Sequence, residues 1–409
     1  MYVNETYLPP GEAELAGLIA RAASQKLPLE IRGNGSKHFI GRPMQVATRL
    51  STSELRGITL YEPAELVISA RSGTPLAEIE ALLDKNGQEL PFEPHQLEQL
   101  SPVETRGPAT IGGVISANSS GPRRILRGSA RDHLIGIRAV NGLGEIIKSG
   151  GRVMKNVTGY DLGRGIAGSW GTLAVLTEIT LKVMPKAEEM RTLIFLNLPD
   201  EGAVTAMCRA VGSAFEISGT VHLEMPFVER LSDPDIAKLG RSVTALRVEN
   251  FSASLDYRVA RLHEELRPFG ALYELDDNRS HAFWRDIRGL TFLAGSNWPL
   301  WRITTAPDKG AKVVAALRAQ LDCRAAFEWS GGLIWLEVSP ATDAGATVLR
   351  RVIAEFQADA MLIRAGAPAR AAVDVFQPLA EVNMMLIRRL KEAFDPHRIL
   401  NPGRMYAGI

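Results

Sequence analysis

The sequence predicts an α+β fold with more than one packed part, and three observations lead to this prediction. Short β-rich runs alternate with amphipathic helical stretches along the 409 residues. The order of these elements changes near residue 186. A polar segment that contains Lys186, Glu188, Glu189 and Arg191 marks the predicted domain boundary there and is called the polar joint. After the joint, a β-α-β-β-α order occurs twice, which is typical of helices that cover one face of an antiparallel sheet.

The first predicted domain covers residues 1–185. We expect a helix over 12–26, because Leu15, Leu18, Ile19 and Ala22 recur at helical spacing. A tract over 101–128 is rich in Gly, Ser and Pro, and it is too long to be a simple loop that only connects two elements. The other patterns predict strands at 29–32 and 66–70, a helix at 75–85, a hairpin at 135–148 and a strand at 172–184.

The second predicted domain covers residues 186–370, and we expect it to be a duplicated, ferredoxin-like α+β unit. Only the element order supports the duplication, because no residue-level repeat accompanies it. The first pass has strands at 192–196, 220–224 and 243–248 and helices at 202–212 and 253–266. The second has strands at 301–305, 325–329 and 333–338 and helices at 310–321 and 346–356. Residues 371–409 are predicted to form a helix over 379–394 and a Pro/Gly turn that returns to the first domain.

The composition excludes several classes of protein. With 47 basic and 46 acidic residues, the chain has no overall basic excess to hold a nucleic acid or an anionic membrane. The two cysteines, Cys208 and Cys323, stand far apart, which excludes a Cys-ligated zinc, an iron–sulfur cluster and a disulfide scaffold. No signal-peptide pattern opens the chain, and no apolar run approaches the roughly 20 residues of a membrane-spanning helix. We expect a cytoplasmic protein that contacts a membrane only through a partner.

The usual motifs of hydrolases and metalloenzymes are missing from the sequence. The seven histidines never pair at a metal-ligand spacing, so no metal site is expected. One dinucleotide-binding fingerprint matches by its letters, from Gly163 through Gly165 to Gly168. It follows polar residues instead of a buried strand and opens no long helix, so we interpret it as a chance match.

A first candidate binding loop follows the short predicted strand at 29–32. Glycines and other small residues let consecutive backbone N–H groups turn toward one anion, which makes a nest able to hold a pyrophosphate. Lys37 adds a positive charge. An ordinary β-turn is the alternative interpretation. The residues of this candidate loop are Arg32, Gly33, Asn34, Gly35, Ser36 and Lys37.

A second candidate stretch lies in the long small-residue tract. Two glycines at the mouth of a short helix are predicted to leave its first N–H groups open to a phosphate or a heterocycle edge. Arg123, Arg124 and Arg127 follow at once, which suits a phosphorylated ligand; a solvated surface is the alternative. The candidate residues are Thr110, Ile111, Gly112, Gly113, Ser116, Asn118 and Ser119.

A third candidate stretch runs from Arg152 to Leu162 and continues into the strand predicted at 172–184. Alternating apolar residues beside a glycine would let backbone groups line a flat ring system closely. A purely structural edge strand is the alternative. The candidate residues are Gly171, Thr172, Ala174 and Val175.

Five ordered motifs, which together span nearly the whole chain, resemble the flavin domain of the vanillyl-alcohol oxidase, or PCMH-type, superfamily. They are the R-G-x-G-S/T loop, the T-I-G-G-x-x-x-x-N-x-x-G segment, the hairpin at 131–145, the strand at 171–178 and the ending D-P-x-x-I-L-N-P-G-R at 395–404. Within it, the phrase M-K-N-V-T-G-Y-D-L at 154–162 and the ending at 393–405 are most similar to the E subunits of bacterial glycolate oxidases. The resemblance implies an FAD cofactor, with Asn401 beside it. It also implies two partners, a larger flavoprotein subunit and an iron–sulfur subunit.

The sequence departs from the family pattern at two places, and each departure predicts a property of the site. Members that attach flavin covalently in the first loop have His where this chain has Ser36, which implies non-covalent FAD. The paired H-x-x-H and the G-E-H-G segment of the catalytic subunits are absent, so the sequence identifies no catalytic residue. We expect His222, His263 and His281 to be structural.

Three hypotheses about function remain open. The chain is an FAD-binding subunit that shares redox equivalents within a complex oxidising glycolate to glyoxylate, a stand-alone FAD-dependent dehydrogenase of another 2-hydroxy acid or alcohol, or a non-catalytic assembly subunit. For the first, Arg288, Arg302 and Arg404 are candidates to clamp a carboxylate, and ordinary surface arginines are the alternative.

Overall fold

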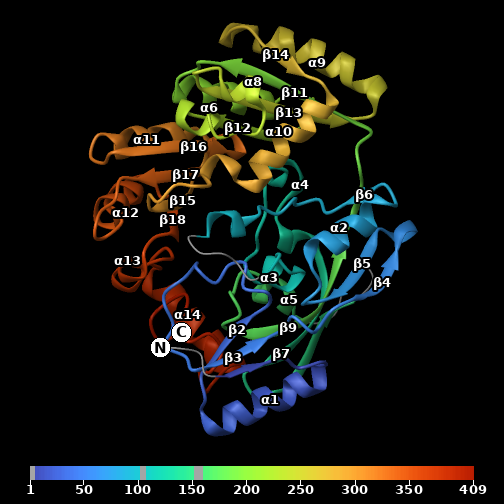
Figure 1. The fold of residues 1–409 in the computed structure, drawn as a ribbon, viewed down its shortest axis with the longest axis vertical. Helices are drawn as coiled ribbons and strands as arrows, with labels where there is room; N and C mark the ends of the chain where they lie inside the picture. Colours follow the sequence, from blue (N-terminus) through green and yellow to red (C-terminus); the bar gives the residue numbers. More distant parts are fainter. Residues whose placement is uncertain (1–4, 102–106, 152–159) are drawn as a thin grey trace.

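The computed structural model describes residues 5–101, 107–151 and 160–409, and its two largest sheets lie one above the other along the long axis of the molecule (Figure 1). The lower part contains a five-stranded antiparallel sheet in the order β4-β5-β9-β7-β8. Its strands are β4 (Ile58–Glu62), β5 (Val67–Arg71), β9 (Ala174–Lys182), β7 (Leu134–Asn141) and β8 (Ile146–Gly150). The predicted hairpin is therefore confirmed as β7 and β8.

A small parallel sheet, β1-β3-β2, lies beside the larger one. It is made by β1 (Glu5–Tyr7), β3 (Thr48–Ser51) and β2 (Leu29–Arg32). Helix α1 (Glu12–Gln25), whose Leu15 and Ile19 are fully buried, packs below both sheets (Figure 1). The other elements here are α2 (Leu76–Asp84), β6 (Gln88–Glu89), β10 (Met184–Pro185) and the short helices α3 (Ile111–Ser116), α4 (Arg124–Arg127) and α5 (Leu162–Ile166).

The upper part is one eight-stranded sheet in the order β14-β11-β13-β12-β16-β17-β15-β18. The first four strands are β11 (Glu189–Leu196), β12 (Ile217–Leu223), β13 (Val243–Asn250) and β14 (Tyr273–Leu275). The last four are β15 (Leu300–Thr304), β16 (Cys323–Glu328), β17 (Leu333–Val338) and β18 (Asp359–Arg364). Helices α6 (Asp200–Val211) and α9 (Ser252–Leu266) belong to the first half, and α11 (Gly310–Arg318) and α12 (Ala346–Glu355) to the second.

The two halves of this sheet have the same strand order, reflected about the pairing of β12 with β16. Each half is a ferredoxin-like unit, and the sheet joins them edge to edge. The predicted duplication is thus present in the topology. The sequence prediction missed the outermost strands, β14 and β18, and helix α10 (Asp277–Gly289). Strand β11 begins at Glu189, so part of the predicted polar joint belongs to the sheet; the domain boundaries themselves stay predictions.

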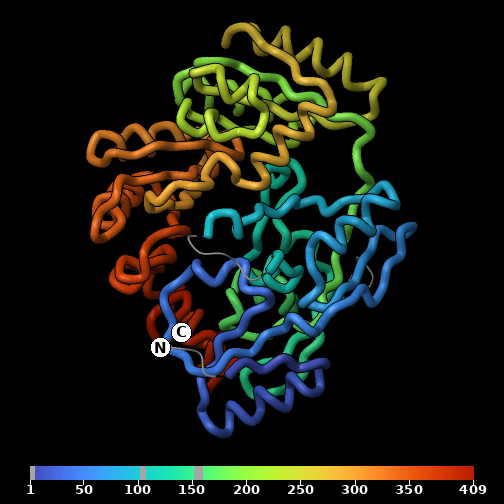
Figure 2. The backbone as a smooth tube through the Cα atoms, in the orientation of Figure 1, coloured from blue at the N-terminus to red at the C-terminus, as the bar shows by residue number. Residues whose placement is uncertain are grey.

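The end of the chain returns to the lower part, beside β2 (Figure 2). After α13 (Ala367–Ala372) and α14 (Glu381–Phe394), Leu400 forms a parallel bridge with Leu29. The amide of Leu29 donates to the Ile399 carbonyl at 2.7 Å, so the tail extends the small parallel sheet. Among the described residues, no helix is long and apolar enough to cross a membrane.

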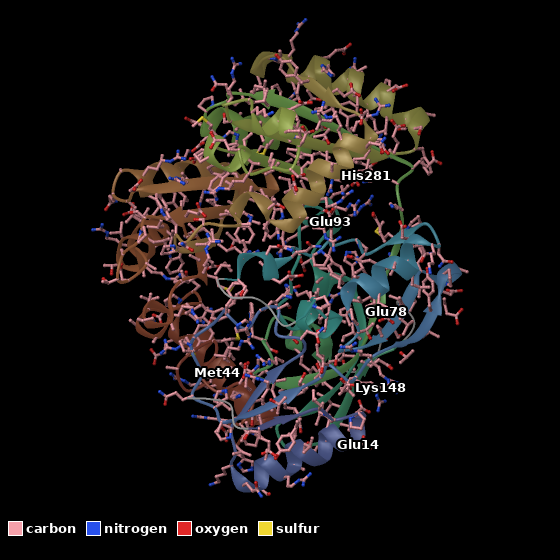
Figure 3. The ribbon with its side chains drawn as sticks, viewed as in Figure 1. Glu14, Met44, Glu78, Glu93, Lys148 and His281 are labelled. Carbon is pink, nitrogen blue, oxygen red and sulfur yellow. The ribbon has the colours of Figure 1, made fainter. Side chains whose placement is uncertain are left out.

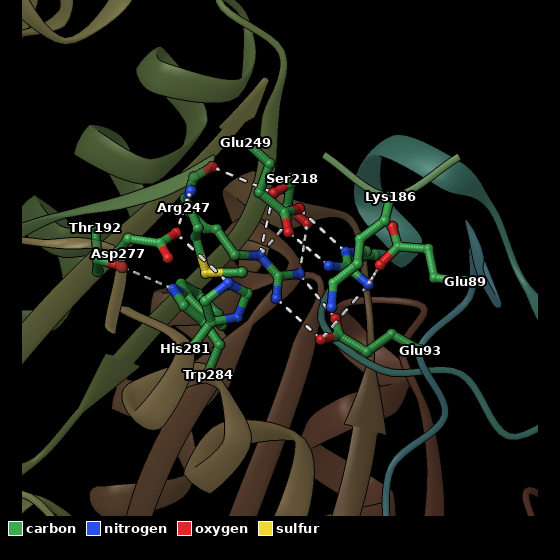
Figure 4. A network of polar contacts seen from close by, with 12 residues as sticks. Glu89, Glu93, Lys186, Thr192, Ser218, Arg247, Glu249, Asp277, His281 and Trp284 are labelled. Carbon is green, nitrogen blue, oxygen red and sulfur yellow. Dashed lines mark hydrogen bonds and ion pairs between the residues drawn. The ribbon is translucent and has the colours of Figure 1, made fainter. Parts of the chain in front are cut away.

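A buried network of charged side chains joins the two parts (Figure 4). From the upper sheet, Arg247 makes a two-point contact with Glu93 at 3.0 and 2.8 Å. From the lower part, Arg123 contacts Glu89 at 2.8 Å and Glu249 at 3.0 Å. Three carboxyl groups therefore share two guanidinium groups at the junction.

Candidate cofactor-binding groove

A groove in the lower part brings the three predicted stretches together. It holds about 680 Å³ of empty space, open to solvent on one side. Thirteen of the eighteen predicted residues line it: Arg32, Gly33, Asn34, Gly35, Ser36, Lys37, Thr110, Gly112, Gly113, Ser116, Gly171, Ala174 and Val175. Segments that are far apart in the sequence thus line a single site.

The loop after β2 presents unused backbone donors to this groove. Gly35 has φ +84°, a conformation that glycine adopts without steric cost. In the described part of the chain, the N–H groups of Asn34, Gly35, Ser36 and Lys37 have no protein acceptor. Consecutive free amides around a glycine of positive φ make a nest for an anion. The geometry therefore supports the predicted pyrophosphate loop over an ordinary β-turn.

Two cationic side chains stand at the same loop. Lys37 is buried, with its Nζ 3.5 Å from the Ser36 hydroxyl, and burial lowers the pKa of its ammonium group. Arg404 donates to the Lys37 carbonyl at 3.1 Å and lies over the Trp170 ring at 5.3 Å. Burial lowers the pKa of Arg404 to about 10, so it keeps its charge at neutral pH. Two positive charges beside free amides suit a diphosphate.

The second stretch forms α3 and differs from the prediction in one respect. The first three amides of α3 donate to the carbonyls of Thr74 and Ser72 and to the Thr110 hydroxyl, at 3.0, 2.8 and 3.2 Å. The expectation that these N–H groups are open is therefore wrong, because a neighbouring turn and the N-cap side chain use them. The contribution of α3 to the groove is its shape.

The two glycines of α3 have different roles. A Cβ on Gly112 would lie 2.7 Å from Ser72, so close packing against that turn requires glycine. A Cβ on Gly113 would meet only the Thr110 hydroxyl, at 3.4 Å, and Gly113 lines the groove. Protein packing does not require glycine at 113, and the space before it remains available to a ligand. The Ser72 hydroxyl, which also lines the groove, is buried without a partner.

The third stretch lines the groove together with the loop. Gly171, with φ +71°, and the first residues of β9 line the groove beside Trp170. Apart from Trp170 and Leu176, the side chains of this stretch in the groove are small or β-branched. The part of the prediction at 152–159 lies outside the described residues.

Five predicted residues lie outside the groove lining, so their contact with the cofactor stays an untested prediction. Ile111 is a core residue, and Asn118 and Ser119 face other partners or the interior. Thr172 donates to the Ser169 carbonyl at 2.7 Å. Asn401 is fully buried; its side chain accepts from the Ile31 amide at 2.7 Å and donates to the Trp170 carbonyl at 2.8 Å. Asn401 thus ties two walls of the groove together.

Sequence reasoning missed several lining residues. These residues were hard to predict because they precede or follow the motifs in the sequence, or because only the folded chain brings them to the groove. Arg404 is the exception, since it closes the recognised ending and was considered only as a carboxylate clamp. The missed lining residues are Glu30, Ile31, His38, Thr52, Ser72, Ala117, Trp170, Leu176 and Arg404.

The arginines predicted to face a phosphorylated ligand do not line this groove. Arg123 belongs to the buried network at the junction, Arg124 lies over Trp329 at 4.7 Å, and Arg127 is exposed. The three candidate carboxylate clamps do not converge either. Arg288 donates to the Pro94 carbonyl at 3.2 Å and pairs with Glu80, whereas Arg302 lies near Trp329.

Two of the three histidines expected to be structural contact other side chains of the protein, and the chance fingerprint lies outside the groove. His222 is buried and contacts the Thr244 hydroxyl at 2.8 Å and Asp200 at 3.3 Å. His281 faces Asp277 on α10. The fingerprint at 163–168 begins on α5, a helix of five residues that ends at Ile166, and it does not line the groove. Within the described ranges, no three His, Cys, Asp or Glu side chains are grouped to hold a metal ion.

Comparisons with known proteins agree with this geometry. Residues 6–150 match the family described as "FAD binding domain", and residues 377–405 match "FAD linked oxidases, C-terminal domain". The fold is similar to p-cresol methylhydroxylase with substrate bound, with a TM-score of 0.73 and 13% identity over 98% of this chain and 88% of that one. It is also similar to alkyldihydroxyacetonephosphate synthase, with a TM-score of 0.68 and 16% identity over 97% and 75% of the two chains. The predicted PCMH-type α+β fold is confirmed.

Fold and groove together define an FAD-linked oxidoreductase. The chain is 34% identical over 398 residues to glycolate oxidase subunit GlcE of Escherichia coli, covering 96% of both chains. It is 27% identical over 241 residues to glycolate oxidase subunit GlcD of Bacillus subtilis, covering 59% of this chain and 49% of that one. The chain belongs to the GlcE family of FAD-linked oxidoreductases, and its cofactor is FAD.

Proposed function

We propose that this chain is the FAD-binding subunit of a glycolate oxidase complex, which oxidises glycolate to glyoxylate and passes electrons to its partners. The observation that carries the proposal is the similarity to GlcE along 96% of both chains. The partners we propose are a larger flavoprotein subunit, of the kind that GlcD represents, and an iron–sulfur subunit. We place the complex in the cytoplasm, with any membrane contact made by a partner.

Bound flavin would supply a reversible two-electron store, which matches the two electrons that glycolate loses on becoming glyoxylate. The residues of this chain hold and orient it. The amides of residues 34–37 with Lys37 and Arg404 would bind its diphosphate non-covalently, while Gly113, Gly171 and Ala174 leave room for its flat rings. No residue of the chain is assigned a proton-transfer role, so the substrate chemistry is proposed to need the complex.

A visible absorption spectrum of the isolated protein, recorded with and without glycolate under anaerobic conditions, tests this proposal. We expect a yellow protein whose flavin bands persist with glycolate alone and bleach once the partner subunits are added. Bleaching by glycolate or another 2-hydroxy acid without partners would support a stand-alone dehydrogenase. The D-lactate dehydrogenase of Archaeoglobus fulgidus, 31% identical over 192 residues, which cover 46% of this chain and 41% of that one, keeps that alternative open. A protein that stays colourless after incubation with FAD would indicate an assembly subunit.

A further inference from the structure

A second hollow lies between α4 and the turn that joins β16 to β17. It holds about 950 Å³ of empty space, is open to solvent, and shares no lining residue with the FAD groove. The side chains that carry the inference are Arg124, Arg302, Thr304, Thr305, Trp329 and Ser330. They come from both parts of the molecule, so the folded chain assembles the hollow.

Two guanidinium groups meet at one indole ring in this hollow. Arg124 lies 4.7 Å and Arg302 5.2 Å from the centroid of the Trp329 ring. The ring itself is fixed, because its Nε1 donates to the Gly121 carbonyl at 3.0 Å. Trp329 and Ser330 both have positive φ, +52° and +58°, a conformation that costs free energy in residues other than glycine. The turn thus holds the indole in place at a cost in backbone strain.

Neither guanidinium group has an acidic partner. Across the described residues, no carboxylate lies within 4.0 Å of Arg124 or Arg302. Glu328, the acid that acts on Arg302 electrostatically, is already occupied by His95 at 3.1 Å and by the Trp335 indole at 2.7 Å. The neighbouring Arg123, by contrast, pairs with Glu89 and Glu249. Asp132 acts on Arg124 electrostatically and is itself bonded by the Ser129 hydroxyl at 2.7 Å. Two half-buried positive charges without an ion pair therefore face one hollow.

The groups around these charges add hydrogen-bonding capacity. Thr305 Oγ1 is buried and has no hydrogen-bond partner, and Thr304 and Ser330 line the same space. Burial and the proximity of Arg124 lower the pKa of Arg302 to about 10, which leaves it charged at neutral pH. A planar anion with two oxygens matches the fork of a guanidinium group, and the indole face accommodates a short carbon chain.

We propose that this hollow is a binding site for a small carboxylate anion. Its carboxylate oxygens would accept hydrogen bonds from Arg124 and Arg302 and compensate charges that the chain itself leaves unpaired. The site goes beyond the proposed function, because it does not require that the protein oxidise its ligand or that FAD respond to it.

Isothermal titration of the FAD-loaded wild-type protein with oxalate, a dicarboxylate with no C–H bond to oxidise, tests the proposal. We expect saturable binding of oxalate and none of the uncharged analogue oxamide. Arg302→Gln and Arg124→Gln should each weaken oxalate binding about tenfold or more, since each removes a charge-assisted hydrogen bond. The matched control is Arg324→Gln, because Arg324 lies over Trp298 at 4.3 Å, also without an ion pair among the described residues, but outside the hollow.

Three results would overturn the site. Oxalate could fail to bind saturably, the three variants could bind it equally well, or inorganic phosphate could bind while oxalate does not, which would leave an anion site that is not selective for carboxylates. If Arg302→Gln does not fold, the half-buried Arg124 on a short helix decides the matter through its own variant. Flavin content, measured in parallel, separates this outcome from a failure of the proposed function.

Discussion

At the scale of single residues, the FAD groove depends on backbone amides that the protein leaves without partners. The four N–H groups from Asn34 to Lys37 have no acceptor among the described residues, whereas the first amides of α3 donate within the protein. Burying amide donors without partners is costly, so a ligand that accepts from all four gains affinity from their pre-arrangement. Three substitutions test this view of the groove, two of its shape and one of its charge.

Gly113→Val should lower the FAD content of the purified protein at least several-fold while the fold survives. The added side chain would enter the groove, because packing within the protein leaves that space empty. Gly35→Val should also lower FAD content, but its φ of +84° adds strain to the loop. Flavin absorbance per chain, with circular dichroism as a check of folding, measures both effects.

The matched control for Gly113→Val is Gly165→Val. Gly165 lies on α5, and a Cβ there meets nothing within 4 Å. This control should retain full flavin, as should a substitution of His222, which lies in the upper sheet. Stoichiometric flavin in Gly113→Val would contradict our placement of the site.

Lys37→Met should weaken FAD binding by about tenfold or more, because it removes a buried charge beside the diphosphate nest. Titration of flavin-free protein with FAD, followed by flavin fluorescence, measures the affinity. Lys148→Met is the control, since Lys148 is exposed on the lower part (Figure 3). Equal affinities in the two variants would show that Lys37 takes no part in binding.

The sequence predicted the residues of this loop well because its small residues and the strand before it are local features. It failed for α3, where the acceptors Ser72 and Thr74 lie nearly forty positions earlier in the chain. It also assigned Arg404 no place at the cofactor, because only the return of the tail to β2 brings that side chain to Trp170.

At the scale of elements, the tail is held by a buried ion pair at the end of α14. The Lys391 ammonium group contacts Asp395 at 2.8 Å and donates to the carbonyls of Thr172 at 2.7 Å and Leu400 at 3.0 Å. Asp395 in turn accepts from the amides of Ile399 and Leu400. This pair positions the turn that carries Asn401 and Arg404 against the groove.

Lys391→Met should lower the free energy of unfolding by about 3–5 kcal/mol, because it leaves a buried carboxylate and two carbonyls without their partner. Denaturant unfolding of the FAD-free protein measures the change. Arg389→Met, an exposed site on the same helix, should change stability by less than about 0.5 kcal/mol. Similar small losses in both variants would mean that the ion pair does not hold the tail.

Element order was the most predictable property of the upper part. The β-α-β-β-α pattern indicated the duplicated units because each helix and central strand has a clear apolar period. The missed strands lie at the sheet edges: β14 has three residues, and β18 begins and ends with a charged residue. Helix α10 was missed because its first turn is polar, although Asp276 caps it and Phe283 and Ile287 are buried at helical spacing.

At the scale of the whole molecule, the charged network couples the two parts (Figure 4). Its members are distant in the sequence, so no local pattern could predict their pairing, and Arg123 was instead expected at the ligand. Three carboxyl groups share two arginines there. Burial, opposed by Arg123 and reinforced by Glu249 and Glu93, raises the pKa of Glu89 to about 7.

This shift predicts a pH dependence of stability. Between pH 4.5, the ordinary pKa of the Glu89 carboxyl, and about 7, the folded protein keeps a proton that the unfolded chain has lost. The Glu89 contribution to the free energy of unfolding therefore falls as pH rises through this window and is constant above it. Glu89→Gln should remove that fall and be more stable than wild type at pH 8, by on the order of 2 kcal/mol.

Denaturant unfolding at several pH values between 5 and 8 measures this difference. The matched control is Glu78→Gln, because Glu78 is exposed on α2, away from the junction (Figure 3). Its curve should run parallel to that of the wild type. A Glu89→Gln curve that also runs parallel would mean that the Glu89 carboxyl is ionised at the junction throughout this range.

The most direct test of the central claim is a crystal structure of the protein with FAD bound. We predict the diphosphate within hydrogen-bond distance of the amides of residues 34–37, near Lys37 and Arg404, and the flavin ring system along Gly113, Gly171 and Ala174. FAD bound elsewhere, such as at the hollow between Arg124 and Arg302, or a diphosphate that does not touch this loop, would contradict the account.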